Sequence, residues 1–389
     1  MTGRALSLSF AFVFALPGLA AAAPSTAREH GTVETAHARW DHDLIVTDLV
    51  VRLNDGTQIT VTEPGGTVDG IGMSVSHRDA NLHRGDEVEL MTEPSGLRVR
   101  RAAKHAVTVG VLAATGSRHG VQRTTKSLRP LYHPTGCLSF QYDARGSAKV
   151  EAEWAAFDAA FDAWESRTES SECGGLNFNH ELVQDAPDGH DGVNTVHFRD
   201  TTWCRPASGL DPELCHSPDA VGVTRVLYVD DPVSPRDGEI LEVDIEINAV
   251  NFALATDGRT TAIDLASAAA HEIGHALGLD HNCGTETGAW PVDDTGTLVP
   301  SCESASTDLV AATMYFQVPP GVTTMRTPEA GDVDGLCSVI QARCVGEISG
   351  GCSVSGTRNP TRAPFPLGAL FAVFGFAFVL RRRRVALKR

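Results

Sequence analysis

Residues 271–281 read His-Glu-Ile-Gly-His-Ala-Leu-Gly-Leu-Asp-His, and this stretch decides how the rest of the chain is interpreted. His271 and His275 are four residues apart, so on a helix both imidazoles project from one face and can reach a single metal ion. Gly278 permits the left-handed conformation that ends a helix, and the chain can then return His281 to the same metal as a third ligand. Three protein ligands leave the fourth position of a zinc ion open for water, which is the catalytic pattern.

Glu272 follows the first histidine directly and lies about 100° around the helix from it. Its carboxylate is therefore placed to hold a water molecule beside the metal without replacing that water as a ligand. The sequence predicts zinc as the cofactor, with His271, His275 and His281 as its ligands and Glu272 as the general base. The alternative is that the histidines are ordinary residues satisfied by hydrogen bonds.

These eleven residues resemble the zinc-binding consensus of the metzincin peptidases. The resemblance implies a methionine turn further along the chain, and residues 312–316 (Ala-Thr-Met-Tyr-Phe) are similar to it. A lone methionine is otherwise ordinary core filler. The position of Met314, about 33 residues beyond His281 and followed by tyrosine, resembles the matrixin branch, which comprises the matrix metalloproteinases and their bacterial relatives. The resemblance implies an α+β metzincin-like fold, with a twisted mixed sheet, an active-site helix and Met314 beneath the metal.

The composition is that of an ordinary globular protein, since 42% of the 389 residues are hydrophobic and 21% are charged. This length is sufficient for two domains. The formal net charge of −17 argues against a nucleic-acid partner, because phosphate binding needs a basic surface. The dense basic run is confined to residues 381–389.

Residues 1–23 have the features of a secretory signal peptide. They carry Arg4, an apolar run over residues 5–16 and four alanines at positions 20–23. The alternative, a transmembrane helix, is disfavoured because the run is short and ends in Pro17-Gly18. We therefore expect an exported protein.

Export implies that the nine cysteines serve mainly as disulfides. Eight of them lie between positions 137 and 344, in or just after the expected catalytic region. Proximity in the sequence predicts two of the pairs, Cys204 with Cys215 and Cys283 with Cys302.

Residues 28–125 show period-two patterning interrupted by turn residues, which predicts a small all-β domain before the catalytic one. The stretch holds no recognisable metal site. A propeptide, a folding aid and a binding module all remain open for it. The matrixin latency motif Pro-Arg-Cys-Gly is not found in the sequence, so latency through a cysteine thiolate on the zinc is not supported.

The catalytic domain is expected over residues 127–347, after a polar, turn-rich boundary. It opens with a strand over residues 138–142, followed by an amphipathic helix with one aromatic stripe. Asp264 is the expected N-cap of the zinc helix, and a closing helix is expected over residues 330–341. The aromatic stripe consists of Trp154, Phe157, Phe161 and Trp164. Further strands are expected at residues 176–178, 195–198, 221–229 and 239–247.

The order of these elements resembles the metzincin upper subdomain. The resemblance implies that the strand over residues 223–228 is the edge of the sheet above the cleft, and an edge strand can bind an extended peptide. Asp244 and Asn248 resemble a pattern of bacterial matrixins that leaves a calcium role open. The alternatives for these two residues are a solvated face and a strand cap.

Residues 350–389 form the second informative region. They contain Cys352, an apolar run over residues 365–380 and four arginines at residues 381–384. Sixteen helical residues span about 24 Å, which is short for a stable membrane anchor. The arrangement resembles a MYXO-CTERM type sorting tag, which implies a bacterial protein cut near Cys352 by a sorting protease and displayed on the cell surface. The alternative is a plain C-terminal anchor.

The sequence as a whole predicts a zinc endopeptidase that hydrolyses extracellular proteins or peptides. The alternative is a catalytically silent, surface-displayed adhesion or binding protein with a structural zinc site. Glu272 argues against this alternative, because a structural zinc site needs no general base.

Overall fold

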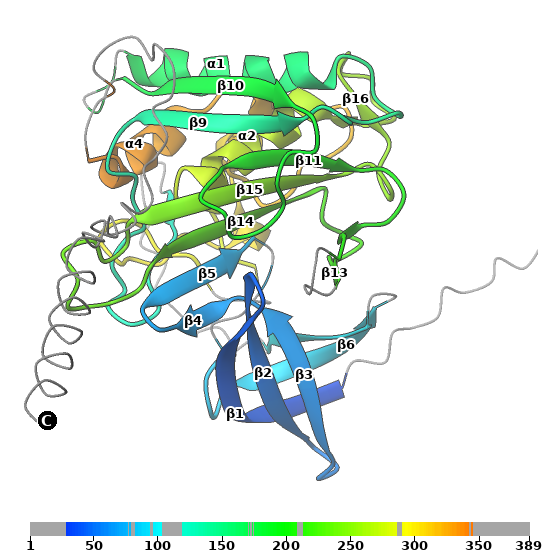
Figure 1. The fold of residues 1–389 in the computed structure, drawn as a ribbon, viewed down its shortest axis with the longest axis vertical. Coiled ribbons are helices and arrows are strands. Elements are labelled where there is room, and N and C mark those ends of the chain that lie inside the picture. The colour runs from blue at the N-terminus through cyan, green and yellow to red at the C-terminus, as the bar shows by residue number, and fades with distance from the viewer. Residues whose placement is uncertain are drawn as a thin grey trace, which may run out of the picture.

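A seven-stranded mixed sheet with helices on one face forms the centre of the molecule (Figure 1). The computed structural model describes residues 29–76, 78, 82–93, 96–102, 119–169, 171, 173, 175–207, 213–285, 290–341 and 344. The strands of the seven-stranded sheet, in spatial order, are β10 (Asn177–Val183), β9 (Cys137–Asp143), β11 (Thr195–Arg199), β15 (Ile240–Asn248), β14 (Gly222–Val229), β5 (Ile71–Val75) and β4 (Gly66–Val68). The first four are parallel, whereas β14, β5 and β4 each run antiparallel to the preceding neighbour. The expected mixed α+β class is confirmed.

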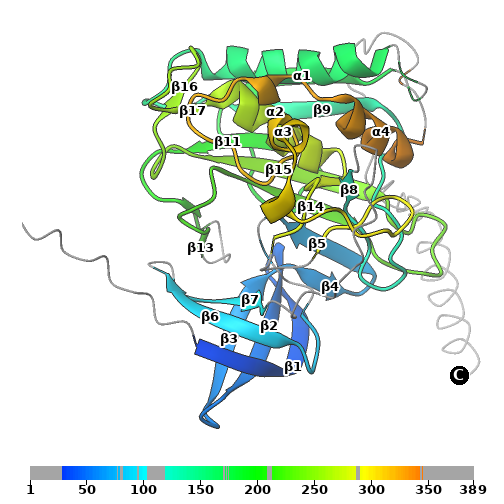
Figure 2. The same cartoon turned by 180° about the vertical axis from the view of Figure 1, so that it is seen from behind.

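A second, five-stranded antiparallel sheet is built from the N-terminal part of the chain. Its strands, in spatial order, are β3 (Gln58–Pro64), β2 (Leu44–Leu53), β1 (Glu29–Asp41), β6 (Glu87–Glu93) and β7 (Gly96–Arg101). Its core contains Val33, Leu49, Val51 and Val88, each at most 1% exposed. Figures 1 and 2 show β4 and β5 lying between this sheet and β14.

The strands within residues 28–125 therefore pair with a strand outside this stretch as well as with one another. Its described residues contain strands and no helix, as the alternating pattern predicts, but β4 and β5 join the large sheet through β14. Alternation identifies a strand without naming its partner, so the sequence could not show this pairing. The prediction that β14 is the edge of the sheet is wrong, because β15 pairs with one side of it and β5 with the other.

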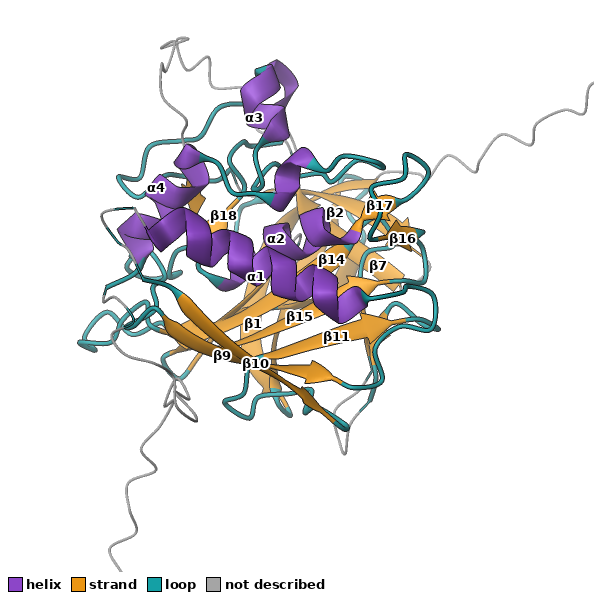
Figure 3. Ribbon diagram, turned by 90° about the horizontal axis from the view of Figure 1, so that it is seen from above, coloured by secondary structure: helices purple, strands orange, loops and turns teal. Residues whose placement is uncertain are grey.

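The helices lie together on one side of the large sheet (Figure 3). They are α1 (Glu153–Glu169), α2 (Leu265–Ala276), the short α3 (Thr307–Ala311) and α4 (Ala330–Val339). Phe157, Phe161 and Trp164 of α1 are at most 1% exposed, and Trp154 is half-buried. This stripe packs on the sheet through Phe140 and Tyr142 of β9, as the spacing predicts.

Short elements complete the described chain. Three two-stranded pairs are β8 (Gly120–Val121) with β18 (Leu279–Asp280), β12 (Cys204–Arg205) with β13 (Leu214–Cys215), and β16 (Leu254–Ala255) with β17 (Ile263–Asp264). Two 3₁₀ turns are Cys302–Ser304 and Thr324–Arg326.

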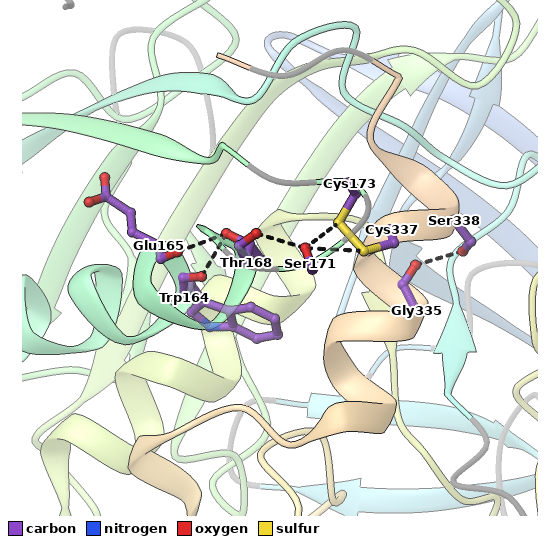
Figure 4. Close-up of a disulfide and its surroundings, with 8 residues drawn as sticks. All are labelled: Trp164, Glu165, Thr168, Ser171, Cys173, Gly335, Cys337 and Ser338. Carbon is purple, nitrogen blue, oxygen red and sulfur yellow. Dashed lines mark hydrogen bonds between the residues drawn. A yellow bond between two sulfur atoms is a disulfide. The ribbon is translucent and has the colours of Figure 1, made fainter. Parts of the chain in front are cut away.

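Four disulfides link the described cysteines. Cys204–Cys215 and Cys283–Cys302 are the two pairs that proximity predicts. Cys137–Cys344 and Cys173–Cys337 join residues 207 and 164 positions apart, which proximity could not reveal. Figure 4 shows Cys173–Cys337 tying the segment that follows α1 to α4. Ser171, which donates a hydrogen bond to the Thr168 carbonyl oxygen, lies beside this disulfide.

Two predicted segments lie outside the described residues, the signal peptide at 1–23 and the sorting tail at 350–389. Both stay predictions. Among the residues that the structure describes, no helix is long and apolar enough to cross a membrane.

Candidate metal centre

The helix that carries the first two histidines is fixed at its start by Asp264, as the sequence predicts. The buried Asp264 carboxylate accepts a hydrogen bond from the Ser267 backbone N–H at 3.0 Å and so caps the helix. Arg326 pairs with the same carboxylate at 2.5 Å. Alanine and serine at positions 266–270 have small side chains, so α2 lies deep in the core and all twelve of its residues are buried.

The chain leaves α2 by the turn that Gly278 was expected to make. Gly278 has a φ of +96°, the left-handed region that favours glycine, and its N–H donates to the His275 carbonyl oxygen at 3.0 Å. The following β18 pairs with β8, and this pairing turns His281 back toward the helix. Gly120 of β8 must be a glycine, because a Cβ there would lie 2.2 Å from the His281 carbonyl oxygen.

The structure brings the three predicted ligands together. One ring nitrogen from each of His271, His275 and His281 lies within 4.8 Å of the other two. The ring centroids are 4.7 Å apart for His271 and His275, 5.3 Å for His271 and His281, and 4.9 Å for His275 and His281. His271 and His275 are buried and His281 is half-buried.

Backbone carbonyl groups orient two of these rings. His271 Nδ1 donates to the Thr313 carbonyl oxygen at 2.7 Å, and His275 Nδ1 donates to the Leu279 carbonyl oxygen at 2.9 Å. Because a carbonyl oxygen only accepts, Nδ1 carries the proton in both rings and Nε2 holds the lone pair that a metal ligand needs. Burial lowers the pKa of His271 to about 4, so its imidazole is neutral near pH 7.

This donor set fits a zinc ion. Three imidazole nitrogens are a typical ligand set of zinc and of several other transition metals. The described residues hold a second group of ligand-type side chains, Cys204, Glu213 and Cys215, but these cysteines form a disulfide and offer no thiolate. The histidine group is therefore the better metal site in the described part of the chain.

Met314 lies against α2, the helix that carries His271 and His275, where the resemblance places it. It is 1% exposed, and a Cβ on Gly274 would lie 2.2 Å from its sulfur atom. Gly274 stands between the first two histidines in the sequence, so its bare backbone lets the methionine approach the floor of the site. The Met314 carbonyl oxygen also accepts a hydrogen bond from the Asn282 N–H at 3.0 Å.

Glu272 is buried and faces β14. The Thr224 hydroxyl donates to Glu272 Oε2 at 2.6 Å. A Cβ on Gly222 would lie 2.6 Å from Oε1, so a side chain at that position would displace the carboxylate from this place. Burial raises the pKa of Glu272 to about 7, although the Thr224 hydrogen bond lowers it. A divalent cation held by the neighbouring histidines would favour the charged carboxylate.

Three residues that support the site were missed by sequence reasoning. Gln122 donates from Nε2 to the His275 and Leu279 carbonyl oxygens, both at 2.9 Å, and so secures the turn between the ligands. Thr224 donates a hydrogen bond to the Glu272 carboxylate, and Gly222 leaves room for it. No sequence signal singles these residues out, because each contacts the site across at least 48 residues of chain.

Asp244 and Asn248 form bonds within the protein. Asp244 is buried and pairs with Arg225, and it accepts a hydrogen bond from Thr195 Oγ1 at 2.5 Å. Asn248 ends β15 and accepts hydrogen bonds from the N–H groups of the next loop, as a strand cap does. The solvated-face alternative is wrong because both residues are buried. The calcium role stays a prediction.

The search of family models and the search of curated proteins both found no match to the chain.

Proposed function

We propose that the protein is a zinc-dependent endopeptidase with a metzincin-like, matrixin-type catalytic domain. The observation that carries the proposal is the convergence of three imidazole nitrogens beside a buried carboxylate from the same helix. Glu272 is not one of the three ligands, so it is available for proton transfer. The order of strand, helix, strands and zinc helix, with Met314 against that helix, also supports the metzincin-like assignment.

His271, His275 and His281 would hold the zinc ion, which supplies Lewis acidity that polarises a carbonyl group and acidifies water. Glu272 then accepts the proton of the attacking water and delivers it to the leaving amine, so that one carboxylate serves as base and then as acid. The Thr224 hydroxyl holds Oε2 and thereby fixes the rotamer of the carboxylate. The other oxygen, Oε1, lies over Gly222.

Changing any one ligand, in His271→Ala, His275→Ala or His281→Ala, is expected to lower the zinc content of the purified protein well below one ion per chain. Each variant leaves an incomplete and more hydrated coordination sphere. Metal analysis by mass spectrometry after dialysis measures the content. His133→Gln is the matched control, because His133 is buried beside α2 and donates to the Ala276 carbonyl oxygen without being a ligand. Full zinc occupancy in all three variants would refute the ligand assignment.

We also propose that the protein is exported and displayed on a bacterial cell surface. The four disulfides support this, because such bonds persist in oxidising compartments. The sequences of residues 1–23 and 350–389 supply the expected export signal and sorting tail.

Removal of residues 350–389 is expected to release the protein into the culture medium, because the apolar run in that segment is the anchor that the sequence predicts. Fractionation of cells that express full-length and truncated chains measures the distribution. A chain that keeps the four arginines at residues 381–384 and lacks residues 365–380 tests the apolar run by itself. Equal surface retention of all forms would show that another segment holds the protein.

A further inference from the structure

The strand beside Glu272 is already paired with an internal extended segment. β5 runs antiparallel to β14 from Ile71 opposite Val229 to Val75 opposite Arg225. A peptide that added itself to this side of β14 would form the same antiparallel ladder, which is the usual mode of strand addition. β5 therefore occupies the position that such a peptide needs.

The occupying segment leads directly toward the proposed general base. Beyond β5, the Ser76 N–H donates to the Thr224 carbonyl oxygen at 2.9 Å, and Ser76 Oγ accepts from the Thr224 N–H at 2.8 Å. The Thr224 side chain in turn donates to Glu272. Thr224 of β14 thus links Ser76, at the end of the segment, to the Glu272 carboxylate.

The side chains of this segment alternate in size. Gly72, Ser74 and Ser76 share one face, because side chains alternate along a strand. This face is tight: a Cβ on Gly72 would lie 2.4 Å from the Tyr228 ring, and Ser74 Oγ donates to Gln122 Oε1 at 3.0 Å. The opposite face carries Met73 and Val75, which are buried in an apolar cluster with Leu44, Ile45, Val223 and Leu227.

A buried ion pair fastens the chain just after the segment. Arg78 Nη1 lies 3.1 Å from Glu63 Oε2, and the two side chains are 5% and 1% exposed. Arg78 also donates to the Cys215 carbonyl oxygen at 2.8 Å, and Glu63 accepts from the Val99 N–H at 2.8 Å. The Arg78–Glu63 pair thus connects the end of the segment to the N-terminal sheet and to the disulfide-closed β12–β13 pair.

We propose that residues 71–76 are an internal occupant of the peptide-binding side of β14, held there by the N-terminal sheet and by the Arg78–Glu63 pair. The peptide that replaces them runs antiparallel to β14, with small side chains toward Tyr228 and apolar side chains on the other face. This inference rests on the proposed function, since it makes the N-terminal sheet the inhibitor of the same site.

The test compares three forms of the full chain: wild type, Glu63→Gln/Arg78→Met and Glu34→Gln/Arg52→Met. The last is the matched control, because Arg52 and Glu34 form an exposed ion pair 2.5 Å apart in the same sheet. The first double variant is expected to raise kcat/KM for a peptide library at least about tenfold, since only molecules with the segment displaced can bind substrate. The control should match wild type. Equal rates in all three forms at equal zinc content would overturn the inference and leave the proposed function standing.

Hydrogen exchange of the wild-type chain provides a second readout that needs no hydrolysis and no variant. The added probe is an extended decapeptide hydroxamate that alternates glycine or serine with valine. Faster exchange of the amides of residues 71–76 in its presence is expected, because the peptide displaces them from β14. Unchanged or slower exchange would overturn the inference. If no form hydrolyses peptides, the proposed function fails, and the exchange result still decides whether the segment is displaceable.

Discussion

Glu272→Gln is expected to lower kcat for peptide hydrolysis by about 10² to 10⁴, the range for a positioned acid–base group. This corresponds to about 3 to 5 kcal/mol of barrier. The amide has nearly the same shape as the carboxylate and Glu272 is not one of the three ligands, so zinc content and fold should stay unchanged. The lost property is the ability to accept the proton of water.

The comparison is best made in two backgrounds, wild type and Glu63→Gln/Arg78→Met, so that occupation of β14 does not hide the effect. Glu303→Gln is the control, because it makes the same chemical change at an exposed residue of the 3₁₀ turn Cys302–Ser304. Cleavage rates are measured at equal zinc content. A rate ratio near one, with zinc-dependent activity in both proteins, would refute the role of Glu272. Absence of activity in every form would favour the surface-displayed binding protein.

Trp164→Ala is expected to lower the free energy of unfolding by about 3 to 5 kcal/mol, the usual range when a buried tryptophan is truncated. Trp164 is 0% exposed and joins α1 to α2. Its Nε1 donates to the Ala270 carbonyl oxygen at 2.9 Å, and its Cζ2 lies 3.1 Å from the position of a Cβ on Gly274. The substitution would leave a cavity directly under the segment that carries the first two histidines.

Urea unfolding of the zinc-loaded protein with its disulfides intact measures this loss. Trp164→Phe should cost less, about 1 to 3 kcal/mol, because it keeps most of the packing and loses the hydrogen bond. Trp154→Ala is a matched control on the same stripe, and a smaller loss than for Trp164→Ala is expected since Trp154 is half-buried. Equal losses for both alanine variants would contradict the view that the fully buried Trp164 stabilises the fold more than the half-buried Trp154.

The sequence predicts the local features of the site well, because each is encoded over a few residues. The spacing of His271 and His275, the cap at Asp264 and the helix end at Gly278 all depend on neighbours within one or two turns. The aromatic stripe of α1 is likewise predictable, because residues spaced by the helical period lie on one face of the helix. For the same reason, proximity finds the Cys204–Cys215 and Cys283–Cys302 disulfides.

The features that could not be predicted join distant parts of the chain. The pairing of β5 with β14 connects residues about 150 positions apart, and alternation in either strand is compatible with many partners. The orientation of His271 depends on the carbonyl group of Thr313, and every residue has a carbonyl group, so no side-chain pattern reveals which one serves. The glycine at position 222 is informative only once Glu272 is known to lie over it.

The Cys137–Cys344 disulfide also determines how the molecule bears mechanical load. If the chain is tethered to a surface through its C-terminal end, tension enters at Cys344 and crosses the disulfide to Cys137 at the start of β9. The 206 residues between them, including α2 and the three histidines, form a covalently closed loop that the force bypasses. A pull between the two ends of the chain is then borne by the part before Cys137, which contains the N-terminal sheet, β4, β5 and β8. Shear flow at a cell surface would strain that part first, and the load would reach the metal centre only through the pairing of β8 with β18 and the hydrogen bonds of Gln122.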